Sequence, residues 1–480
     1  MSADGRFPLS FSPTVAIARL PAYADAQPGG QTSQALGRLA DAMGWSNERG
    51  PLGRVVPDGA RVVIKPNLVL HRNEGTGGVE CLVTHPSLIR AVTDAALRTG
   101  ASEVLVGDAP IQGCDFDTLL DESGLRAWDR EQTALDSRFA GVQDFRRTTC
   151  VLVHGVRVSA ENVRPPDRFT RFDLGQESLL EPISGGDRFR VAWYDHRLMA
   201  RTHHPGVHQY LIAREVIDAD VIINLPKLKT HKKAGVTCAL KNLIGINGNK
   251  EYLPHHRRGG SARGGDNYPG DDVVRRALEY VTDKQNVTSS YTAGMGWHLL
   301  FAVLARTSRY RGDHIGMDGS WCGNDTIWRT CLDLNRILLY GRPDGSMAEE
   351  IQRRVIHVAD AVIAGQGDGP LAPDPLALGL LLGGDNAAAV DWVSAQLLGY
   401  DPGKVALVRS AFDQFRWPIA KIPASGISVV GDLGEGDPRP VLDRLRRPVI
   451  HPKGWRDAAA APPSDRISPW SAPAAAGASR

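Results

Sequence analysis

Three basic side chains follow directly after a predicted strand and could bind an anion. Residues 221–223 are apolar, and Pro226 disfavours a helical turn before it, so the backbone is expected to stay extended past the strand end. Side chains alternate along an extended chain, so Lys227, Lys229 and His231 are predicted to face the same side. An anion between the two lysines would offset their repulsion, about 2.5 kcal/mol at an effective dielectric near 20.

The alternative is that these lysines form a solvated loop, as most charge runs do, and we adopt that interpretation for Lys232 and Lys233. For Lys227, Lys229 and the nearby pair Lys241–Asn242 we favour ligand binding. Ligands of open α/β sheets bind at the carboxyl ends of the strands.

Other predicted strands also end in polar side chains. Lys65 and Asn67 follow Val62–Ile64, where a cation and an amide could hold an anion, or could simply cap a helix end and form a turn. Asp108 follows the next strand, and could pair with a lysine, bind a cation or cap a helix.

The glycine-rich run Gly365–Pro370 follows a further predicted strand. A proline ends the run and no helix opens there, so a dinucleotide fingerprint is disfavoured. We expect the N–H groups of Gly367 and Gly369 to approach a ligand, with Asp368 directed at that ligand or at a lysine.

Asn324 lies at the start of a strongly predicted helix. It could cap this helix, or it could be a further polar group of the site.

The metal-ligating residues exclude some cofactors and leave others open. The six cysteines contain no Cys-x-x-Cys pair, so neither a zinc ribbon nor an iron–sulfur cluster is supported. A divalent metal held by His and Asp remains open, and Asp108 and His255 are its candidate ligands. No P-loop, Gly-x-Ser-x-Gly or His-Glu-x-x-His motif occurs.

The amino-acid composition narrows the classes of binding partner that we expect. The 480 residues have a formal charge of +2 and 23% charged residues, which argues against a nucleic-acid or membrane partner. Scattered thiols and the lack of an apolar leader predict a reducing, cytoplasmic location. The oligomeric state is left open.

The elements that position these residues alternate between strand and helix. Strands are expected near residues 14–17, 61–64, 103–106, 221–224, 355–364, 378–382 and 427–430, and helices near 32–43, 86–98, 116–128, 237–244, 324–340 and 386–398. This alternation predicts an α/β fold, a doubly wound and mostly parallel sheet with an irregular, antiparallel and loop-rich cap.

The expected organisation has six parts. They are a first α/β half (1–140), an insertion or lid (141–210), an α/β motif segment (211–250), an insertion rich in Gly, His and Arg (251–322), a second α/β half (323–456) and a disordered tail (457–480).

Several of these segments together resemble a bacterial and archaeal family, the domain of unknown function 362. They are VVIKPNLV, EVLVGDAP, VIINLPKLKTHKKAGVTCALKNLIG with GNKEYLPHHRRG, GNDTIWRTCLDLNRILLYG, and VADAVIAGQGDGP with AVDWVSAQLLGYDP. The resemblance implies the fold and the choice of residues, but no settled activity. Some relatives have ferredoxin-like cysteine motifs, which this chain lacks.

These observations predict an enzyme that acts on an anionic small substrate bearing phosphate or carboxylate groups. Lys65, Lys227 and Lys241 would hold the anion, and His231, Asp368 or Lys229 would act as acid or base. The alternatives are a non-catalytic anion or metabolite sensor, and a metal-dependent isomerase or transferase.

Overall fold

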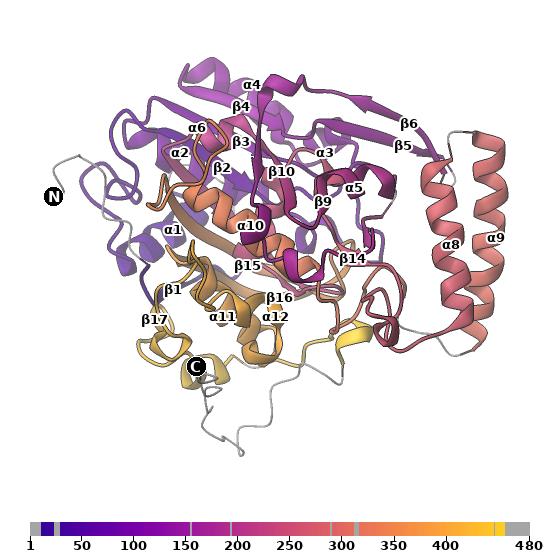
Figure 1. Ribbon diagram of the computed structural model, residues 1–480. Helices are drawn as coiled ribbons and strands as arrows, with labels where there is room; N and C mark the ends of the chain where they lie inside the picture. Colours follow the sequence, from indigo (N-terminus) through magenta and orange to yellow (C-terminus); the bar gives the residue numbers. More distant parts are fainter. Residues whose placement is uncertain are drawn as a thin grey trace, which may run out of the picture.

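A ten-stranded, mostly parallel sheet forms the centre of the computed structural model, which describes residues 11–23, 29–153, 156–192, 194–288, 290–311, 316–445 and 447–456 (Figure 1). The strands lie in the order β17 (Ser428–Gly431), β1 (Thr14–Arg19), β16 (Ala372–Gly384), β15 (Arg354–Asp368), β11 (Val221–Leu225), β2 (Arg61–Pro66), β3 (Glu103–Asp108) and β4 (Phe139–Asp144). Two short strands, β12 (Lys227–His231) and β13 (Gly235–Thr237), extend from β15. Along the main path only β16 runs antiparallel to its neighbours. The predicted α/β fold with a mostly parallel sheet is confirmed.

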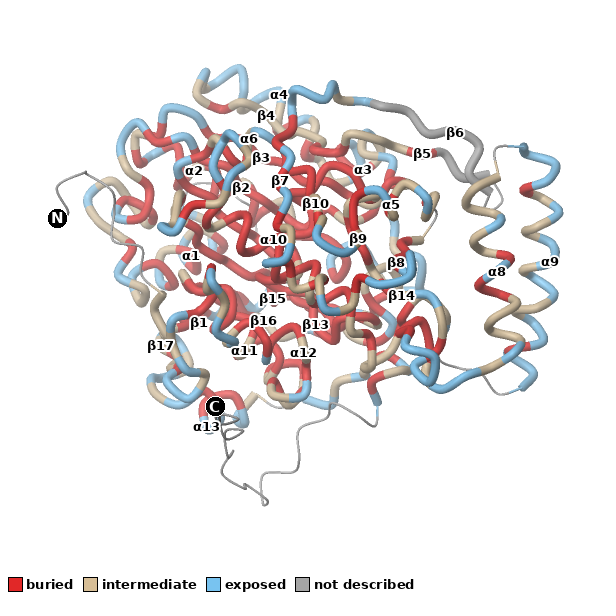
Figure 2. The backbone as a smooth tube through the Cα atoms, viewed as in Figure 1, coloured by how far each residue is buried: buried red, intermediate tan, exposed pale blue. Residues whose placement is uncertain are grey.

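Helices cover both faces of this sheet because neighbouring residues of the buried strands point to opposite sides. Val62 and Ile64 pack with α1 (Gln31–Ala42), α2 (Pro86–Arg98), α3 (Phe116–Glu122) and α4 (Leu125–Leu135). Val63, on the other face, belongs to the core formed with α7 (Ala239–Asn242), α10 (Ile327–Tyr340), α11 (Ala387–Leu397) and α12 (Ala406–Ser410). The result is a three-layer arrangement with a buried centre (Figure 2).

Most predicted elements form close to their expected bounds, but three differ. The helix expected near 116–128 is broken by Gly124, whose φ of 68° begins α4. The helix expected over 237–244 is only α7, followed by a 3₁₀ turn, Leu243–Ile246. The strand expected at 378–382 is the much longer β16, which returns antiparallel to β15 as a hairpin.

The cap contains the predicted antiparallel strands and also two helices that we did not predict. The strands are β7 (Phe169–Asp173), β10 (Val207–Ala213) and β9 (His203–His204), with the pairs β5 (Thr148–Val153) and β6 (Val156–Asn162), and β8 (Phe189–Arg190) and β14 (His256–Arg257). Helices α8 (Val273–Val287) and α9 (Tyr291–Tyr310) form a hairpin that projects from the body (Figure 1).

The remaining helices are short: α5 (His196–Thr202), α6 (Arg214–Asp218) and α13 (Pro438–Asp443). Among the described residues no helix is long and apolar enough to cross a membrane. The predicted disordered tail, 457–480, lies outside the described residues.

Gly365 on β15 illustrates how tightly β12 packs on the sheet. A Cβ atom there would lie 2.7 Å from Cβ of Lys229 and 2.9 Å from the Cys81 carbonyl oxygen. We therefore expect Gly365→Ala to lower the free energy of unfolding by about 1–3 kcal/mol, the usual cost of overpacking. Gly37→Ala in α1, where a Cβ meets no atom within 4 Å, is the matched control and should stabilise by about 0.5–1 kcal/mol. Urea unfolding of both variants measures the difference, and equal stabilities would contradict the packing argument.

Candidate functional site

The strand after Pro226 forms as predicted, with a register irregularity between Lys227 and Lys229 in its pairing with β15. β12 is extended from Lys227 to His231 and pairs with β15 in parallel and with β13 antiparallel. Burial raises the pKa of the Cys81 thiol, and the charges of Lys227 and Lys229 lower it. The predicted extended conformation is confirmed.

Lys65 and Asp108 form a buried ion pair beneath this strand. Lys65 Nζ lies 2.6 Å from Asp108 Oδ1, and both side chains are almost fully buried. The other carboxylate oxygen, Oδ2, accepts the Leu68 amide at 2.7 Å. Gly245 lets the backbone pass over the pair, because a Cβ there would lie 1.9 Å from Asp108 Oδ1. Of the three roles left open for Asp108, pairing with a lysine is the one observed.

Two asparagines connect Lys65 to Lys229. Asn242 Oδ1 accepts hydrogen bonds from Lys65 Nζ (3.2 Å) and Asn67 Nδ2 (3.0 Å). Asn67 Oδ1 in turn accepts one from Lys229 Nζ at 2.9 Å, and the Leu82 carbonyl accepts another at 2.5 Å. The structure thus brings together Lys65, Asn67, Asp108, Lys229 and Asn242, as the sequence predicted for a single site.

Lys229 has no carboxylate partner among the described residues, although its side chain is fully buried. Burial, and then the charges of Lys227 and Lys241, hold the pKa of Lys229 well below its usual value. Two neutral oxygens, from Asn67 and Leu82, are the hydrogen-bond acceptors of its amine.

Lys227 is neutralised within the protein instead. Its Nζ lies 2.7 Å from Asp360 Oδ2 and donates a hydrogen bond of 2.7 Å to the Tyr23 hydroxyl. Asp360 is itself fully buried and also accepts the His85 amide at 2.9 Å. The predicted anion between Lys227 and Lys229 is therefore replaced, on the Lys227 side, by Asp360.

Lys241 projects from α7, whose position depends on Asp391. The Asp391 carboxylate accepts the amides of Ala239 (2.6 Å) and Leu240 (3.2 Å) at the first turn of α7. Burial raises the pKa of Asp391 to about 7. The Asp391 side chain is fully buried, so this residue is not a solvated position of its helix.

The ammonium group of Lys241 is the centre of a cluster of positive charge. It is half-buried and makes no hydrogen bond or ion pair with any residue that the structure describes. Its charge lowers the pKa of six neighbouring lysines and histidines. They are Lys65, Lys229, His231, Lys233, Lys250 and His255.

Two further lysines of this cluster were not predicted as ligand-binding residues. Lys233 and Lys250 are each only 8% exposed, and neither ammonium has a partner within the described ranges. Burial is the main cause that lowers their pKa values, to about 8 for Lys233 and about 7 for Lys250. The interpretation of Lys233 as part of a solvated loop was wrong. The segment GNKEYLPHHRRG, which supports the family resemblance, contains Lys250 and was the sequence signal for this residue.

His231 and His255 lie within the same electrostatic cluster. His231 is buried, and burial followed by Lys241, Lys233 and His255 holds its pKa well below the usual value. Burial and the neighbouring Lys233, Lys241 and Lys250 do the same for His255. We call Lys229, Lys233, Lys241, Lys250, His231 and His255 the cationic cluster.

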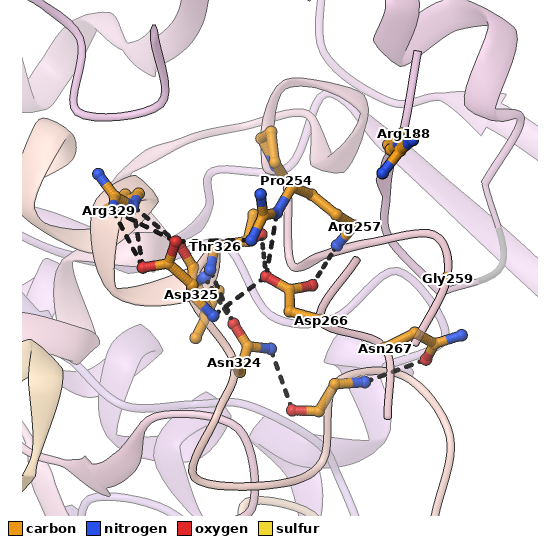
Figure 3. Close-up of polar contacts among 12 residues, drawn as sticks. Arg188, Pro254, Arg257, Gly259, Asp266, Asn267, Asn324, Asp325, Thr326 and Arg329 are labelled. Atoms are coloured by element: carbon orange, nitrogen blue, oxygen red, sulfur yellow. Dashed lines mark hydrogen bonds and ion pairs between the residues drawn. The ribbon is translucent and has the colours of Figure 1, made fainter. Parts of the chain in front are cut away.

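Asn324 lies just before α10, next to Asp325 and Thr326 (Figure 3), and it binds the backbone of His255. Its Nδ2 donates to the His255 carbonyl at 2.9 Å, and its Oδ1 accepts the amides of Thr326 and Ile327, both at 3.0 Å. Asp266 binds the same turn through the Asp325 amide and the Thr326 hydroxyl. Both polar ends of Asn324 are thus used inside the protein, so it positions the site.

The glycine-rich hairpin lies outside the cluster. Gly367 N donates to the Ile450 carbonyl and Gly369 N to the Gly367 carbonyl, so neither amide is available to a ligand. Asp368 is exposed, and its carboxylate lies 3.6 Å from Lys453 Nζ. These residues are glycine-rich because β12 packs closely on them: a Cβ at Gly369 would lie 2.1 Å from the Thr230 carbonyl.

Metal binding receives no support from the described residues, which contain no group of three or more His, Cys, Asp and Glu side chains suited to a metal ion. Asp108 is engaged by Lys65, and the neighbours that influence His255 are lysines. The cysteines are all free.

A cavity of about 270 Å³ lies away from the cluster. Its lining includes Phe11, Trp45, Arg353, Arg354 and Asp385. Arg354 begins β15, so this cavity is at the opposite end of the sheet from β12. We therefore base the candidate site on the cationic cluster.

A family model described as a domain of unknown function (DUF362) matches residues 62–158 and 186–396, well over half of the chain. The chain belongs to the DUF362 family. Every residue of the cationic cluster lies within the matched ranges, as do Lys65, Asp108, Asp360 and Asp391. The site is thus built from the DUF362 domain itself.

Two further proteins resemble this DUF362 member over part of its length. The thylakoid-associated protein sll1697 of Synechocystis sp. is 24% identical over 215 residues, which is 45% of this chain and 48% of that protein. A crystal structure of a Thermotoga maritima protein covers 74% of this chain and 56% of its own, at 10% identity and a TM-score of 0.30. At that TM-score the likeness supports no statement about fold or function.

The ion pair of Lys227 generates a test of its structural role. Lys227→Met would leave Asp360 buried without its cation, so we expect a loss of about 3–5 kcal/mol in the free energy of unfolding. Lys421→Met removes an exposed lysine and should change it by less than about 0.5 kcal/mol. Chemical denaturation of the two variants measures both free energies of unfolding. If Lys227→Met were as stable as Lys421→Met, the ion pair would not be a structural requirement.

Proposed function

We propose that this DUF362 protein is an enzyme that acts on an anionic small substrate bearing phosphate or carboxylate groups. The observation that supports this most directly is that the amines of Lys233, Lys241 and Lys250 have no hydrogen-bond or ion-pair partner among the residues that the structure describes. Burying a cation costs several kcal/mol unless an opposite charge compensates it. A bound anion would supply that compensation.

The position of the cluster agrees with this proposal. Lys227–His231 and Lys241 follow the carboxyl end of β11, which is where open α/β sheets bind ligands. Lys250 is influenced by Lys241, Lys65 and Asp108, whereas Lys233 is influenced by Asp318 and Lys241. Lys241 thus influences both of the other two lysines, and a substrate with more than one anionic group would suit three such side chains.

Catalysis is favoured over simple binding because titratable groups accompany the lysines. A sensor needs only the cations, whereas an enzyme also needs an acid or a base within the site. His231 and His255 are such groups, and both are influenced by the same lysines. We also propose a cytoplasmic location, supported by six free cysteines.

Removal of one unpaired cation tests anion binding. We expect Lys241→Met to be at least as stable as wild type without ligand, because Met preserves most of the stem volume and the like-charge repulsion falls. The same variant should lose the rise in melting temperature that anions cause in wild type. Thermal melts with pyrophosphate, citrate and 2-oxoglutarate measure both effects, and Lys421→Met is the control. A ligand-free Lys241→Met protein that melts far below wild type would show that Lys241 has a structural role.

The pH dependence offers a second test, in which two effects have opposite signs. Lys250 has a folded pKa of about 7, below the value near 10.4 of an unfolded lysine. Between these values the unfolded chain binds more protons, so this lysine makes stability rise with pH. Anion binding needs the protonated amine, and should weaken over the same range.

The measurement compares wild type with Lys250→Met from pH 6 to 9.5. Without ligand, the stability of wild type relative to the variant should increase with pH, and the affinity of wild type for pyrophosphate should fall. A difference in stability that is independent of pH would mean that Lys250 keeps its ordinary pKa.

A further inference from the structure

The two imidazoles of the cationic cluster have their protons on opposite nitrogens. His231 Nδ1 accepts the backbone amides of Lys233 (3.0 Å) and Ala234 (3.1 Å), so its proton is on Nε2. His255 Nδ1 lies 2.6 Å from the Leu253 carbonyl, to which it must donate. A neutral His255 therefore has its free lone pair on Nε2.

The surroundings keep both rings neutral. An imidazolium at either position would add a further cation to Lys233, Lys241 and the other lysines that already lower the two pKa values. His231 could not accept two amides at Nδ1 if that nitrogen were protonated. One ring thus offers an N–H donor and the other an unprotonated nitrogen.

The ring of His255 is also fixed in place. Its backbone N–H donates to the Arg190 carbonyl at 2.8 Å, and its carbonyl accepts Asn324 Nδ2 at 2.9 Å. Rotation of the ring would break the bond to the Leu253 carbonyl. A base that is held in one orientation needs little reorganisation before it accepts a proton.

We propose that His255 Nε2 is the general base of this site and that His231 Nε2–H is the donor that stabilises the resulting oxyanion. This inference rests on the proposed binding of an anionic substrate. It names the substrate class as a carboxylate with an acidic C–H bond next to a carbonyl group, and the reaction as a proton transfer.

The step is balanced without a further reactant. The proton moves from the carbon to Nε2 of His255, and the electron pair of the C–H bond shifts to the carbonyl oxygen, which becomes an enolate. The Nε2–H of His231 and the ammonium of Lys241 stabilise this oxygen. Return of the proton to the same or a neighbouring carbon gives exchange, racemisation or isomerisation, and a neutral imidazole donor is known to serve such chemistry.

The tautomers can be tested without any substrate. We expect long-range proton–nitrogen NMR spectra of ¹⁵N-histidine-labelled protein at pH 7 to show His255 protonated at Nδ1 and His231 at Nε2. His255→Gln and His231→Gln assign the two signals among the 14 histidines. A His255 ring protonated at Nε2, or on both nitrogens, would overturn the assignment of the base while leaving anion binding intact.

Proton transfer is tested with 2-oxoglutarate as the probe. In D₂O, wild type should accelerate deuterium exchange at the carbon next to the ketone, followed by proton NMR. His255→Gln should slow this by about 10²–10⁴-fold, with much less change in the calorimetric affinity, whereas His204→Gln, outside the cluster, should match wild type. Binding without exchange, or equal exchange by His255→Gln, would overturn the proton-transfer proposal. Failure of wild type to bind any of the anions tested would instead overturn the proposed function.

Discussion

An excess of buried positive charge at the carboxyl end of the sheet is the constraint on which the rest of this structure depends. Each buried cation costs several kcal/mol unless it is compensated. Asp108 compensates Lys65, Asp360 compensates Lys227, and burial together with the charges of Lys227 and Lys241 lowers the pKa of Lys229. The described residues offer no such partner to Lys241, which Asp391 holds in place through α7. The proposed anionic substrate would supply the compensation that these residues do not.

The sequence was informative where a local pattern determines the structure. Apolar runs located the strands, and the rule that ligands bind at strand ends located Lys65, Lys229 and Lys241. The roles of Asp360 and Asp391 could not be predicted, because the former lies inside a strand and the latter inside a helix, and their partners are distant in sequence. Asp368 was assigned to the site because a glycine-rich run at a strand end can approach a ligand, whereas the antiparallel return of β16 places it at an exposed hairpin.

The amino-acid composition of the cap gave no indication of its two long helices. Residues 251–322 are rich in Gly, His and Arg, and this obscured the helical periodicity of α8 and α9. His255 in this segment was identified as a candidate metal ligand, whereas its neighbours in the structure are lysines. The tautomer of His255 follows from the Leu253 carbonyl, two residues away, but its position depends on Arg190 and Asn324. Such a position is a property of the folded chain alone.

The long sequence separations within the site have a kinetic consequence. Lys65, Asp108, Lys229, Lys241 and His255 come from segments up to 190 residues apart, so their charges meet only after long loops have closed. Repulsion among the lysines is then felt mainly in the native state and little in the transition state for folding. An anion at this site should therefore slow unfolding while leaving the folding rate almost unchanged. The lifetime of the folded protein would thus depend on the anion concentration around it.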